Sequence, residues 1–360
     1  MCGNYPTGDN VGDMFVHTRC KHYLQFNDVE LIVVSIRAQN DYRYESIEVS
    51  TLKTFLYKHK DETFDILMLH APLYTRDKEF INEHKEFFKK IVFVFHGYEA
   101  VNESKVYPKP YEYQRASLIK RMWRKLRTSS ERKKLRGLRR LCSYVGKKLY
   151  FVFVSNSLKK EFIKWTKIKP SENESQIISN GVGNEFEIKS FNKKTKKEYD
   201  FLTIRSDFSS SVYCADILTK LAKEYPQYKF FLIGNGDYFM HNKKPDNLDV
   251  EYKKLTHHEI INYCDRAKCA LMLTRRDTQG VMACEIATFG MPLITSDISV
   301  TREIFDSFQN VQYVTNDTSE INLENIYNIA LNTPVPNKND KYFMKNTSYK
   351  EIELFREITK

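Results

Sequence analysis

Short runs rich in valine, isoleucine and phenylalanine alternate along this chain with amphipathic stretches of helical length, and this alternation leaves few folds open. The runs are apolar on both faces, which is typical of parallel strands covered by helices on both sides. The stretches between them show the 3.6-residue period of a helix, for example at Ile217, Leu218 and Leu221. We expect strands at residues 31–35, 66–69, 91–95, 151–155, 201–204, 230–233, 270–273 and 292–295. The pattern predicts an α/β protein with two doubly wound domains.

The length of 360 residues also favours two domains. A polar, lysine-rich stretch at residues 189–198 is the best candidate for a linker. We therefore predict a first domain at 1–188, a second at 199–335, and a helical tail at 336–360 that packs back on the first domain. The chain enters the first domain without a recognisable strand, so the opening strand is expected to be very short or lost.

Composition and cysteine usage exclude several classes of protein. Twelve glycines and ten prolines are too few for a collagen-like or low-complexity chain. The longest apolar runs are far shorter than the roughly 20 residues that span a bilayer, and no signal sequence opens the chain, so a cytosolic location is expected. The seven cysteines are scattered and form no C-x-x-C pair, which predicts buried reduced thiols rather than a zinc site or disulfides.

Positive charge is concentrated in one segment, residues 114–148. It holds fourteen lysine and arginine residues and one acid, a net +13 against +11 for the whole chain. Apolar residues recur there at helical spacing, and residues 128–130 (Thr-Ser-Ser) offer a break and a cap. The segment predicts two basic amphipathic helices suited to an anionic membrane surface. In the alternative interpretation the apolar stripes pack inward and the charges form a solvated face.

The strongest chemical signal follows the predicted strand at 270–273. A polar loop carries Asp277, Gly280 then permits close approach of the backbone, and a helix begins near Val281. A helix N-terminus after a strand favours anions, because its free N–H groups and its dipole both attract negative charge. Glu285 follows about one turn into the helix, in apolar surroundings where an unpaired carboxylate is costly. Two acids so placed can accept hydrogen bonds from hydroxyl groups on either side of a diphosphate.

An acid, seven residues, a second acid and then A-x-x-G-x-P resembles the nucleotide-sugar site of retaining family-four glycosyltransferases. That family has the GT-B fold, with two doubly wound Rossmann-like domains facing a cleft that holds the donor. The resemblance implies that Asp277 contacts the donor sugar, where the family usually has glutamate, and that Glu285 binds the ribose. It also implies that the backbone amides of Gly280, Val281 and Met282 hold the diphosphate.

Shorter motifs of this family occur in its order over essentially the whole chain. They are an opening similar to G-G-x-x-x-H with the second glycine replaced, a histidine after the third strand, an S-N-S, an N-G-V and a G-x-G. The resemblance assigns Gly12 and His17 to the acceptor side, His96 to catalysis, and Asn180, Gly234 and Gly236 to donor binding.

One departure from the family concerns the donor phosphates, which an arginine and a lysine bind. Arg205 matches the arginine. Tyr213 and Val212 stand where the lysine is expected, before Asp216. A charge-assisted phosphate contact is worth about 1.5–3 kcal/mol, so its loss slows departure of the diphosphate unless Arg275 or Arg276 turns inward. No D-x-D triplet occurs in the chain. We therefore expect no metal and no cofactor, with the diphosphate charge met by Arg205 and helix-terminal amides.

The sequence thus predicts a metal-independent retaining glycosyltransferase that moves a sugar from a UDP- or GDP-sugar to a lipid-linked glycan acceptor. The family resemblance implies a role in capsule or other cell-surface polysaccharide biosynthesis. The expected location is cytoplasmic and peripheral, on the inner face of the cell membrane. The residues expected to bind the membrane are Lys120, Arg121, Trp123, Arg124, Lys125, Arg132, Lys133, Lys134 and Arg136.

Two alternatives come from other classes of protein. A non-catalytic carbohydrate- or lipid-binding partner would keep the fold without turnover. A nucleic-acid-binding protein would use the basic segment, but aromatic residues are not interleaved there as stacking platforms and no nucleic-acid motif accompanies it. We therefore expect no nucleic-acid partner.

Overall fold

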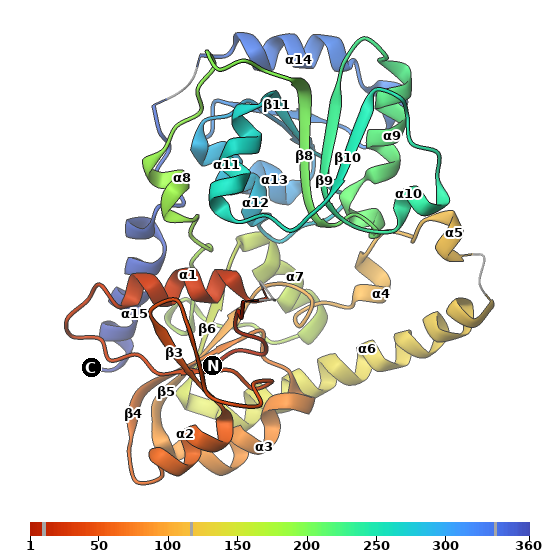
Figure 1. Ribbon diagram of the computed structural model, residues 1–360. Coiled ribbons are helices and arrows are strands. Elements are labelled where there is room, and N and C mark those ends of the chain that lie inside the picture. Colours follow the sequence, from red (N-terminus) through yellow and green to blue (C-terminus); the bar gives the residue numbers. More distant parts are fainter. Residues whose placement is uncertain (9–11, 116–117, 335–336) are drawn as a thin grey trace. The chain divides into compact units, whose positions relative to one another are not determined.

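The computed structural model describes residues 1–8, 12–115, 118–334 and 337–360; at 118–128 it describes only the backbone. The chain divides into two compact units, each built around a parallel sheet (Figure 1). Unit 1 comprises Met1–Val106, Leu126–Gly181 and Met344–Lys360, and unit 2 comprises Tyr107–Lys125 and Val182–Phe343.

The division between the units falls after Gly181, whereas the sequence placed a linker at 189–198. That lysine-rich stretch belongs to unit 2. Lys193 Nζ donates to the carbonyls of Leu331 (3.2 Å) and Thr333 (2.8 Å), and Lys197 Nζ donates to the carbonyl of Asp265 (2.9 Å). Polar composition alone does not separate a linker from a surface segment held by main-chain acceptors.

Unit 1 contains a parallel sheet in the order β4-β5-β6-β7 and a smaller sheet in the order β1-β3-β2. The amide of His70 donates to the carbonyl of Met1 and the amide of Cys2 donates to that of Val34, each at 3.1 Å. The expected opening strand is therefore a single parallel bridge between Cys2 and Ser35. The strands are β1 (Val33–Val34), β2 (Tyr42–Tyr44), β3 (Ile47–Ser50), β4 (Phe64–His70), β5 (Phe88–Phe95), β6 (Leu149–Phe153) and β7 (Ser175–Ile177).

Helices cover both faces of the β4–β7 sheet, because successive side chains of β5 point to opposite sides. Phe93 and Phe95 pack in one cluster with α3, α6 and α7, and Val92 and Val94 pack in another with Leu354 of α15. The helices of unit 1 are α1 (Met14–Tyr23), α2 (Leu52–Lys58), α3 (Tyr74–His84), α4 (Glu103–Val106), α7 (Asn156–Thr166) and α15 (Ser348–Ile358), with 3-10 turns η1 (Lys85–Phe87), η2 (Gly146–Lys148), η3 (Glu172–Glu174) and η6 (Met344–Asn346). Helix α6 (Leu118–Val145) belongs to unit 1 from Leu126 onward.

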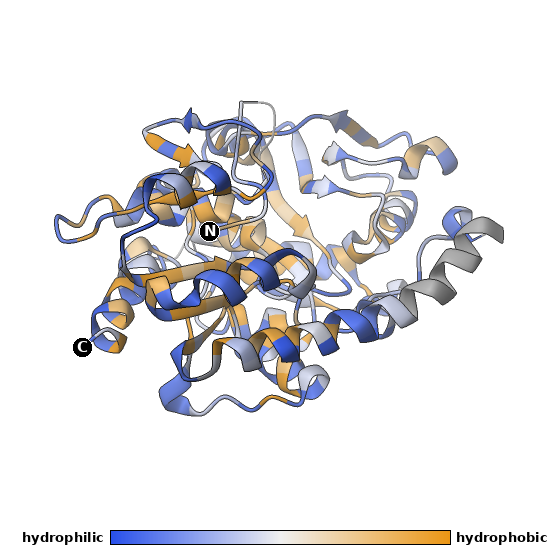
Figure 2. Ribbon diagram, turned by 90° about the horizontal axis from the view of Figure 1, so that it is seen from below, coloured by the Kyte–Doolittle hydropathy of each residue, from blue (hydrophilic) through white to orange (hydrophobic). Residues whose placement is uncertain are grey.

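The basic segment forms one helix, α6, so the predicted break at residues 128–130 is wrong. Serine and threonine cost only a few tenths of a kcal/mol inside a helix, and a 28-residue helix anchored by core contacts tolerates them. Hydrophobic and hydrophilic residues alternate along its coloured part (Figure 2). Leu138, Leu141 and Val145 are buried in the core of unit 1. The apolar stripe of this half of α6 therefore packs inward, as in the alternative interpretation of the sequence.

A buried ionic network joins α1 to α15 inside unit 1. Arg19 Nε donates to both carboxylate oxygens of Glu351, at 3.0 and 3.1 Å, and Tyr23 donates its hydroxyl to Glu351 Oε2 at 2.5 Å. Arg19 is 2% exposed and Glu351 is fully buried. The network fixes the C-terminal helix against the first helix of the chain.

Unit 2 contains a parallel sheet in the order β10-β9-β8-β11-β12-β13. Helices α11, α12 and α13 pack in the cluster on one face, and α9 and α14 pack in the cluster on the other. The strands are β8 (Tyr199–Asp207), β9 (Phe230–Asn235), β10 (Leu248–Tyr252), β11 (Ala267–Met272), β12 (Leu293–Ser296) and β13 (Val311–Val314). The helices are α5 (Glu112–Arg115), α8 (Asn184–Ile188), α9 (Ala215–Glu224), α10 (Tyr238–His241), α11 (His257–Asp265), α12 (Val281–Phe289), α13 (Ser299–Ile304) and α14 (Leu323–Asn332), with 3-10 turns η4 (Ser211–Tyr213) and η5 (Thr318–Glu320).

All eight predicted strands are present, within a few residues of the expected bounds. The seven cysteines are free and buried, as predicted. Burial raises the pKa of the Cys2, Cys142 and Cys214 thiols to about 12. These thiols are therefore protonated and unreactive near neutral pH.

The buried network predicts a stability effect for Glu351→Leu, which leaves the Arg19 guanidinium without its counter-ion. We expect the free energy of unfolding to fall by about 3–5 kcal/mol, measured by urea unfolding. The double variant Arg19→Met, Glu351→Leu should recover most of this loss. Arg356→Gln is the matched control on α15, because it removes an exposed ion pair with Asp28 and a contact with the Phe26 ring and should cost about 1 kcal/mol or less. Equal losses of unfolding free energy in Glu351→Leu and Arg356→Gln would contradict this prediction.

Candidate functional site

Most of the residues predicted for donor binding lie in unit 2, where β8, β9 and β11 end side by side at the carboxyl edge of the sheet. Gly234, the residue before the last of β9, has φ 149°, and a Cβ there would clash with the carbonyl of Arg205. A Cβ on Gly236 would lie 2.7 Å from Phe208 Cδ2. The G-x-G motif thus lets the end of β9 lie directly against the segment after β8.

Arg205 is buried at this edge, with 8% of its surface exposed. Its Nη2 donates to the carbonyl of Leu273 at 2.6 Å, and its Cζ lies 5.1 Å from the centre of the Tyr213 ring. Among the described residues its Nε has no hydrogen-bond partner. Burial lowers the pKa of Arg205, and Tyr213 and Asp277 oppose that shift. A buried guanidinium with a free donor is an arrangement that suits an anion.

Asp277 lies in the loop between β11 and α12, and its carboxylate folds back on that loop. Oδ1 accepts the amides of Thr278 (2.8 Å) and Gln279 (3.3 Å). Gly280 has φ 69°, and a Cβ there would lie 2.8 Å from Asp277 Oδ2. Burial raises the pKa of Asp277, opposed by the Thr278 amide and by the charge of Arg205.

Helix α12 begins at Val281 and ends before Gly290, as predicted, with φ 88° at that glycine. No side chain caps its N-terminus at Gly280. The first amides of a helix have no partner within the helix, so those of Val281 and Met282 are available to an anion. The helix therefore adds backbone donors beside Asp277.

Glu285 is 3% exposed and contacts a histidine that the sequence did not assign to the site. Its Oε1 lies 3.2 Å from His257 Nε2 and accepts the amide of Gly183 at 3.3 Å. The sequence shows no metal-ligand spacing at His257 and His258 and gives neither a role in the site. The side chain of His257 is 31% exposed and that of His258 is 63% exposed. The contacts of Glu285 differ from those of Asp277, and no described group hydrogen-bonds to both acids.

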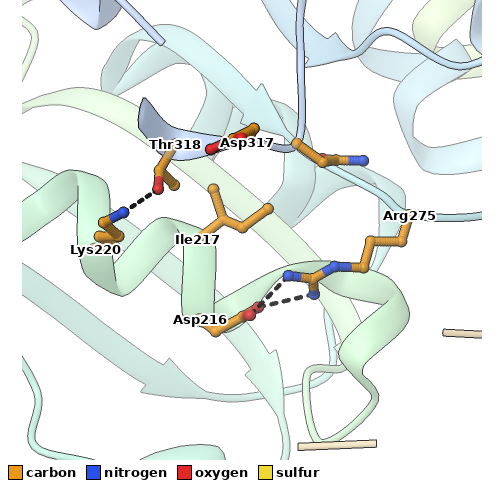
Figure 3. A pocket seen from close by; sticks show the side chains of 7 residues that line it. Asp216, Ile217, Lys220, Arg275, Asp317 and Thr318 are labelled. Carbon is orange, nitrogen blue, oxygen red and sulfur yellow. Dashed lines mark hydrogen bonds and ion pairs between the residues drawn. The ribbon is translucent and has the colours of Figure 1, made fainter. Parts of the chain in front are cut away.

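Arg275 does not take the place of the family's lysine, because Asp216 holds it. Its Nη1 and Nη2 donate to the two carboxylate oxygens of Asp216 at 2.9 and 2.7 Å. The pair borders a pocket of about 410 Å³ between α9, the end of β11 and the segment after β13 (Figure 3). The lining residues are Asp216, Ile217, Lys220, Arg275, Asn316, Asp317 and Thr318. Neither Asp277 nor Glu285 lines this pocket.

The predicted residues of unit 1 include a histidine at the carboxyl end of β5. His96 Nε2 lies 3.1 Å from Nδ1 of His70 at the end of β4, and the ring of Phe15 packs 4.2 Å from the His96 ring. Burial holds the pKa of both histidines well below 6.5. Both rings are therefore neutral near pH 7 and act as hydrogen-bonding groups rather than as cations.

The other predicted residues of unit 1 are Gly12, His17 and Asn180. Gly12 lies in the turn before α1. His17 is buried on α1, where its Nδ1 lies 2.8 Å from the Tyr5 hydroxyl and its Nε2 lies 3.2 Å from a carboxylate oxygen of Glu45. Asn180, predicted to bind the donor, accepts a hydrogen bond from Arg19 Nη1 at 2.5 Å and belongs to unit 1.

The predicted membrane-binding residues fall into two groups. Lys120, Arg121, Trp123, Arg124 and Lys125 lie outside the described side chains. Arg132, Lys133 and Arg136 are exposed on α6, whereas Lys134 is bound in ion pairs with Glu103 (3.3 Å) and Glu131 (2.9 Å). Among the described helices, none is long and apolar enough to cross a bilayer. The described part of the chain contains no cluster of three side chains suited to a metal ion.

Comparison with known proteins establishes the fold. No family model and no curated protein sequence matches the chain. Among solved structures it is similar to a sucrose-phosphate synthase from Thermosynechococcus elongatus (TM-score 0.65, 12% identity, covering 99% of this chain and 92% of that one). It is also similar to a glycosyltransferase from Rickettsia africae (TM-score 0.65, 13% identity, covering 100% and 97%).

Two further structures extend this comparison. An E. coli trehalose-6-phosphate structure bound with UDP-2-fluoro glucose matches with TM-score 0.60 and 11% identity, covering 100% of this chain and 98% of that one. For the GtfA/B complex the TM-score is 0.52 with 14% identity, and the match covers 89% of this chain and 63% of the other. The chain therefore has the GT-B glycosyltransferase fold, with two Rossmann-like domains, as the sequence predicted.

The raised pKa of Asp277 predicts a pH-dependent stability difference for Asp277→Asn. An aspartate whose folded pKa lies above its usual 3.8 stabilises the protein only while protonated, and that stability is lost as the pH rises through the folded pKa. At pH 7 we expect the thermal midpoint of Asp277→Asn to equal or exceed that of the wild type. This advantage should shrink as the pH is lowered toward 3.8.

Asp237→Asn is the matched control, because the Tyr113 hydroxyl lowers the pKa of Asp237. Its midpoint should fall below the wild-type value at pH 7. A midpoint for Asp277→Asn that is lower at pH 7 than at pH 5, relative to the wild type, would contradict the burial of this charge.

Proposed function

We propose that this protein is a retaining, metal-independent glycosyltransferase that uses a UDP- or GDP-sugar as its donor. The observation that carries the proposal is the buried Arg205 guanidinium with its free Nε at the carboxyl edge of the unit 2 sheet. In doubly wound domains ligands bind outside the carboxyl ends of the strands. The GT-B fold and the donor motif of the sequence support the same assignment.

In this proposal the protein neutralises the departing diphosphate with fixed donors. Arg205 supplies a full charge, and the amides of Gly280, Val281 and Met282 supply hydrogen bonds at the start of α12. Groups that are already oriented need no rearrangement as charge develops on the leaving group. Asp277 contacts the donor sugar, which requires its carboxylate to exchange a loop amide for a sugar hydroxyl. Glu285 binds the ribose, and Gly234 and Gly236 shape the adjoining loop.

Unit 1 supplies the acceptor side and His96. By family resemblance the neutral His96 ring hydrogen-bonds to the donor sugar, and Gly12 belongs to the acceptor side. His17 acts by positioning its neighbours, because its buried ring contacts the Tyr5 hydroxyl and the Glu45 carboxylate. By family resemblance the acceptor hydroxyl attacks the face that the diphosphate leaves, and a donor phosphate oxygen helps to remove its proton. Retention of configuration follows from that geometry.

The acceptor is a lipid-linked glycan of a cell-surface polysaccharide such as capsule, and the protein binds the inner face of the membrane from the cytoplasm. The exposed residues Arg132, Lys133 and Arg136 of α6 support this part of the proposal. Because the apolar stripe beneath them is buried, this half of the helix binds through charge alone. Each lysine or arginine near an anionic surface contributes about 1 kcal/mol.

The donor assignment predicts that Glu285→Gln weakens binding of UDP or GDP about tenfold or more, because it removes a charged hydrogen-bond acceptor from the ribose. Isothermal titration calorimetry with each nucleotide measures the affinity, and a panel of UDP-, GDP- and dTDP-sugars measures transfer and hydrolysis. Glu224→Gln, an exposed glutamate on α9, is the matched control and should leave both unchanged.

Three outcomes of this panel are informative. Donor turnover by the wild type that is lost in Glu285→Gln supports the enzyme. Nucleotide-sugar binding without turnover would favour a non-catalytic partner with the same fold, consistent with Tyr213 in the place of the lysine. Unchanged affinity in Glu285→Gln would remove that residue from the site.

The membrane assignment predicts that Arg132→Gln, Lys133→Gln, Arg136→Gln releases the protein from vesicles containing phosphatidylserine. Loss of three surface charges at about 1 kcal/mol each reduces partitioning by about two orders of magnitude. Sedimentation with vesicles at two salt concentrations measures it. The control Lys53→Gln, Lys58→Gln, Lys60→Gln removes the same charge from the exposed face around α2 in the same unit.

Equal sedimentation of the two triple variants with the vesicles would contradict the membrane assignment. Stronger binding to a single-stranded oligonucleotide than to vesicles, lost in the α6 variant, would favour the nucleic-acid alternative.

A further inference from the structure

His257 is held from three sides at the start of α11. Its Nε2 lies 3.2 Å from Glu285 Oε1, and its ring packs edge-on against Phe186 at 5.4 Å between centres. The third neighbour is Gly183, where a Cβ would clash with the imidazole ring. The side chain is 31% exposed. The absence of a side chain at Gly183 thus leaves room for the His257 ring, whose Nε2 faces the buried Glu285 carboxylate.

The contacts of Glu285 are confined to one of its two carboxylate oxygens. Oε1 is held by His257 Nε2 and by the amide of Gly183. Within the described parts of the chain, Oε2 has no hydrogen-bond or ion-pair partner. A carboxylate with one oxygen anchored is fixed in rotation, and its second oxygen is presented in one direction. That is the geometry needed to accept hydrogen bonds from a ligand hydroxyl.

The Glu285 carboxylate needs hydrogen-bond donors from outside α12, because the backbone amides inside a helix are already paired. Cys284 and Ile286, its neighbours in the chain, are buried and apolar. Without a donor at Oε1 the buried carboxylate would be poorly solvated and free to rotate. His257 Nε2 lies beside Oε1 from a different element of the same unit, and the Gly183 amide donates to the same oxygen.

We propose that His257 positions Glu285 for the ribose and so makes the site selective for ribonucleoside diphosphates over their 2′-deoxy counterparts. This inference rests on the proposed function and names a positioning residue and a substrate class for the same site. The 2′-hydroxyl supplies a hydrogen bond that Glu285 accepts. A site built around such an acceptor discriminates against a ligand that lacks the hydroxyl, because a buried polar group is then left unpaired.

The test compares Phe and Gln at position 257 with a matched change at position 258. His257→Phe keeps the ring against Phe186 but removes the donor, and His257→Gln restores a neutral N–H near the position of Nε2. His258→Phe alters the neighbouring, exposed histidine, which faces Glu185. Calorimetry with the full chain measures the affinities for UDP, GDP, their 2′-deoxy analogues and inorganic pyrophosphate.

We expect the wild type to bind UDP or GDP about tenfold more tightly than the 2′-deoxy analogue. His257→Phe should lose most of this preference and should bind pyrophosphate as the wild type does. His257→Gln should recover much of it, and His258→Phe should be unchanged. A structural effect of the substitution would weaken pyrophosphate as well, which separates positioning from misfolding.

Other outcomes overturn the inference in distinguishable ways. Wild-type preference for ribose that survives in His257→Phe removes His257 from the selection, while the proposed function stands. Equal wild-type affinity for ribo- and deoxyribonucleotides overturns the ribose contact itself. If the wild type binds neither nucleotide nor pyrophosphate, the proposed function fails and this inference fails with it.

Discussion

The proposed donor site depends on one buried positive charge. Arg205 is removed from water at the end of β8, yet its guanidinium is held by one carbonyl and one aromatic face and keeps a free Nε. A buried hydrogen-bond donor without a partner is costly, and a bound ligand offsets this cost when it supplies the acceptor. Gly234 allows β9 to approach this point and Gly280 allows the loop with Asp277 to turn beside it. The local backbone of unit 2 is thus arranged around this buried guanidinium.

The buried strands were predictable because both of their faces are apolar, and runs such as 91–95 and 201–204 leave little choice of structure. Five strands gave no such signal. Strand β2 is polar and half-exposed, β3 alternates buried Ile47 and Val49 with polar residues, and β10 at an edge of its sheet alternates leucine and valine with acids. Edge strands need to be apolar on one face only, so their pattern is weak. The break expected in α6 failed because tertiary packing outweighs the small helix cost of serine and threonine.

The candidate site was partly predictable, since Asp277 and Gly280 lie in the loop that follows β11 and Glu285 lies on α12, in the expected order. His257 was missed because two adjacent histidines show no ligand spacing. A usable signal was present: Thr256 and Glu259 form a capping box, which marks the N-terminus of α11. In a doubly wound domain that end of a helix lies at the ligand edge of the sheet. The contacts of Asn180 and Arg275, by contrast, depend on partners distant in the chain and have no local pattern.

The most direct measurement of the central claim is the electron density of UDP or GDP in crystals of the protein. The account predicts a diphosphate within hydrogen-bond distance of Arg205 Nε and the first amides of α12, with the ribose on Glu285. A nucleotide seated instead in the pocket of Asp216 and Arg275, with Arg205 Nε still unpartnered, would contradict it.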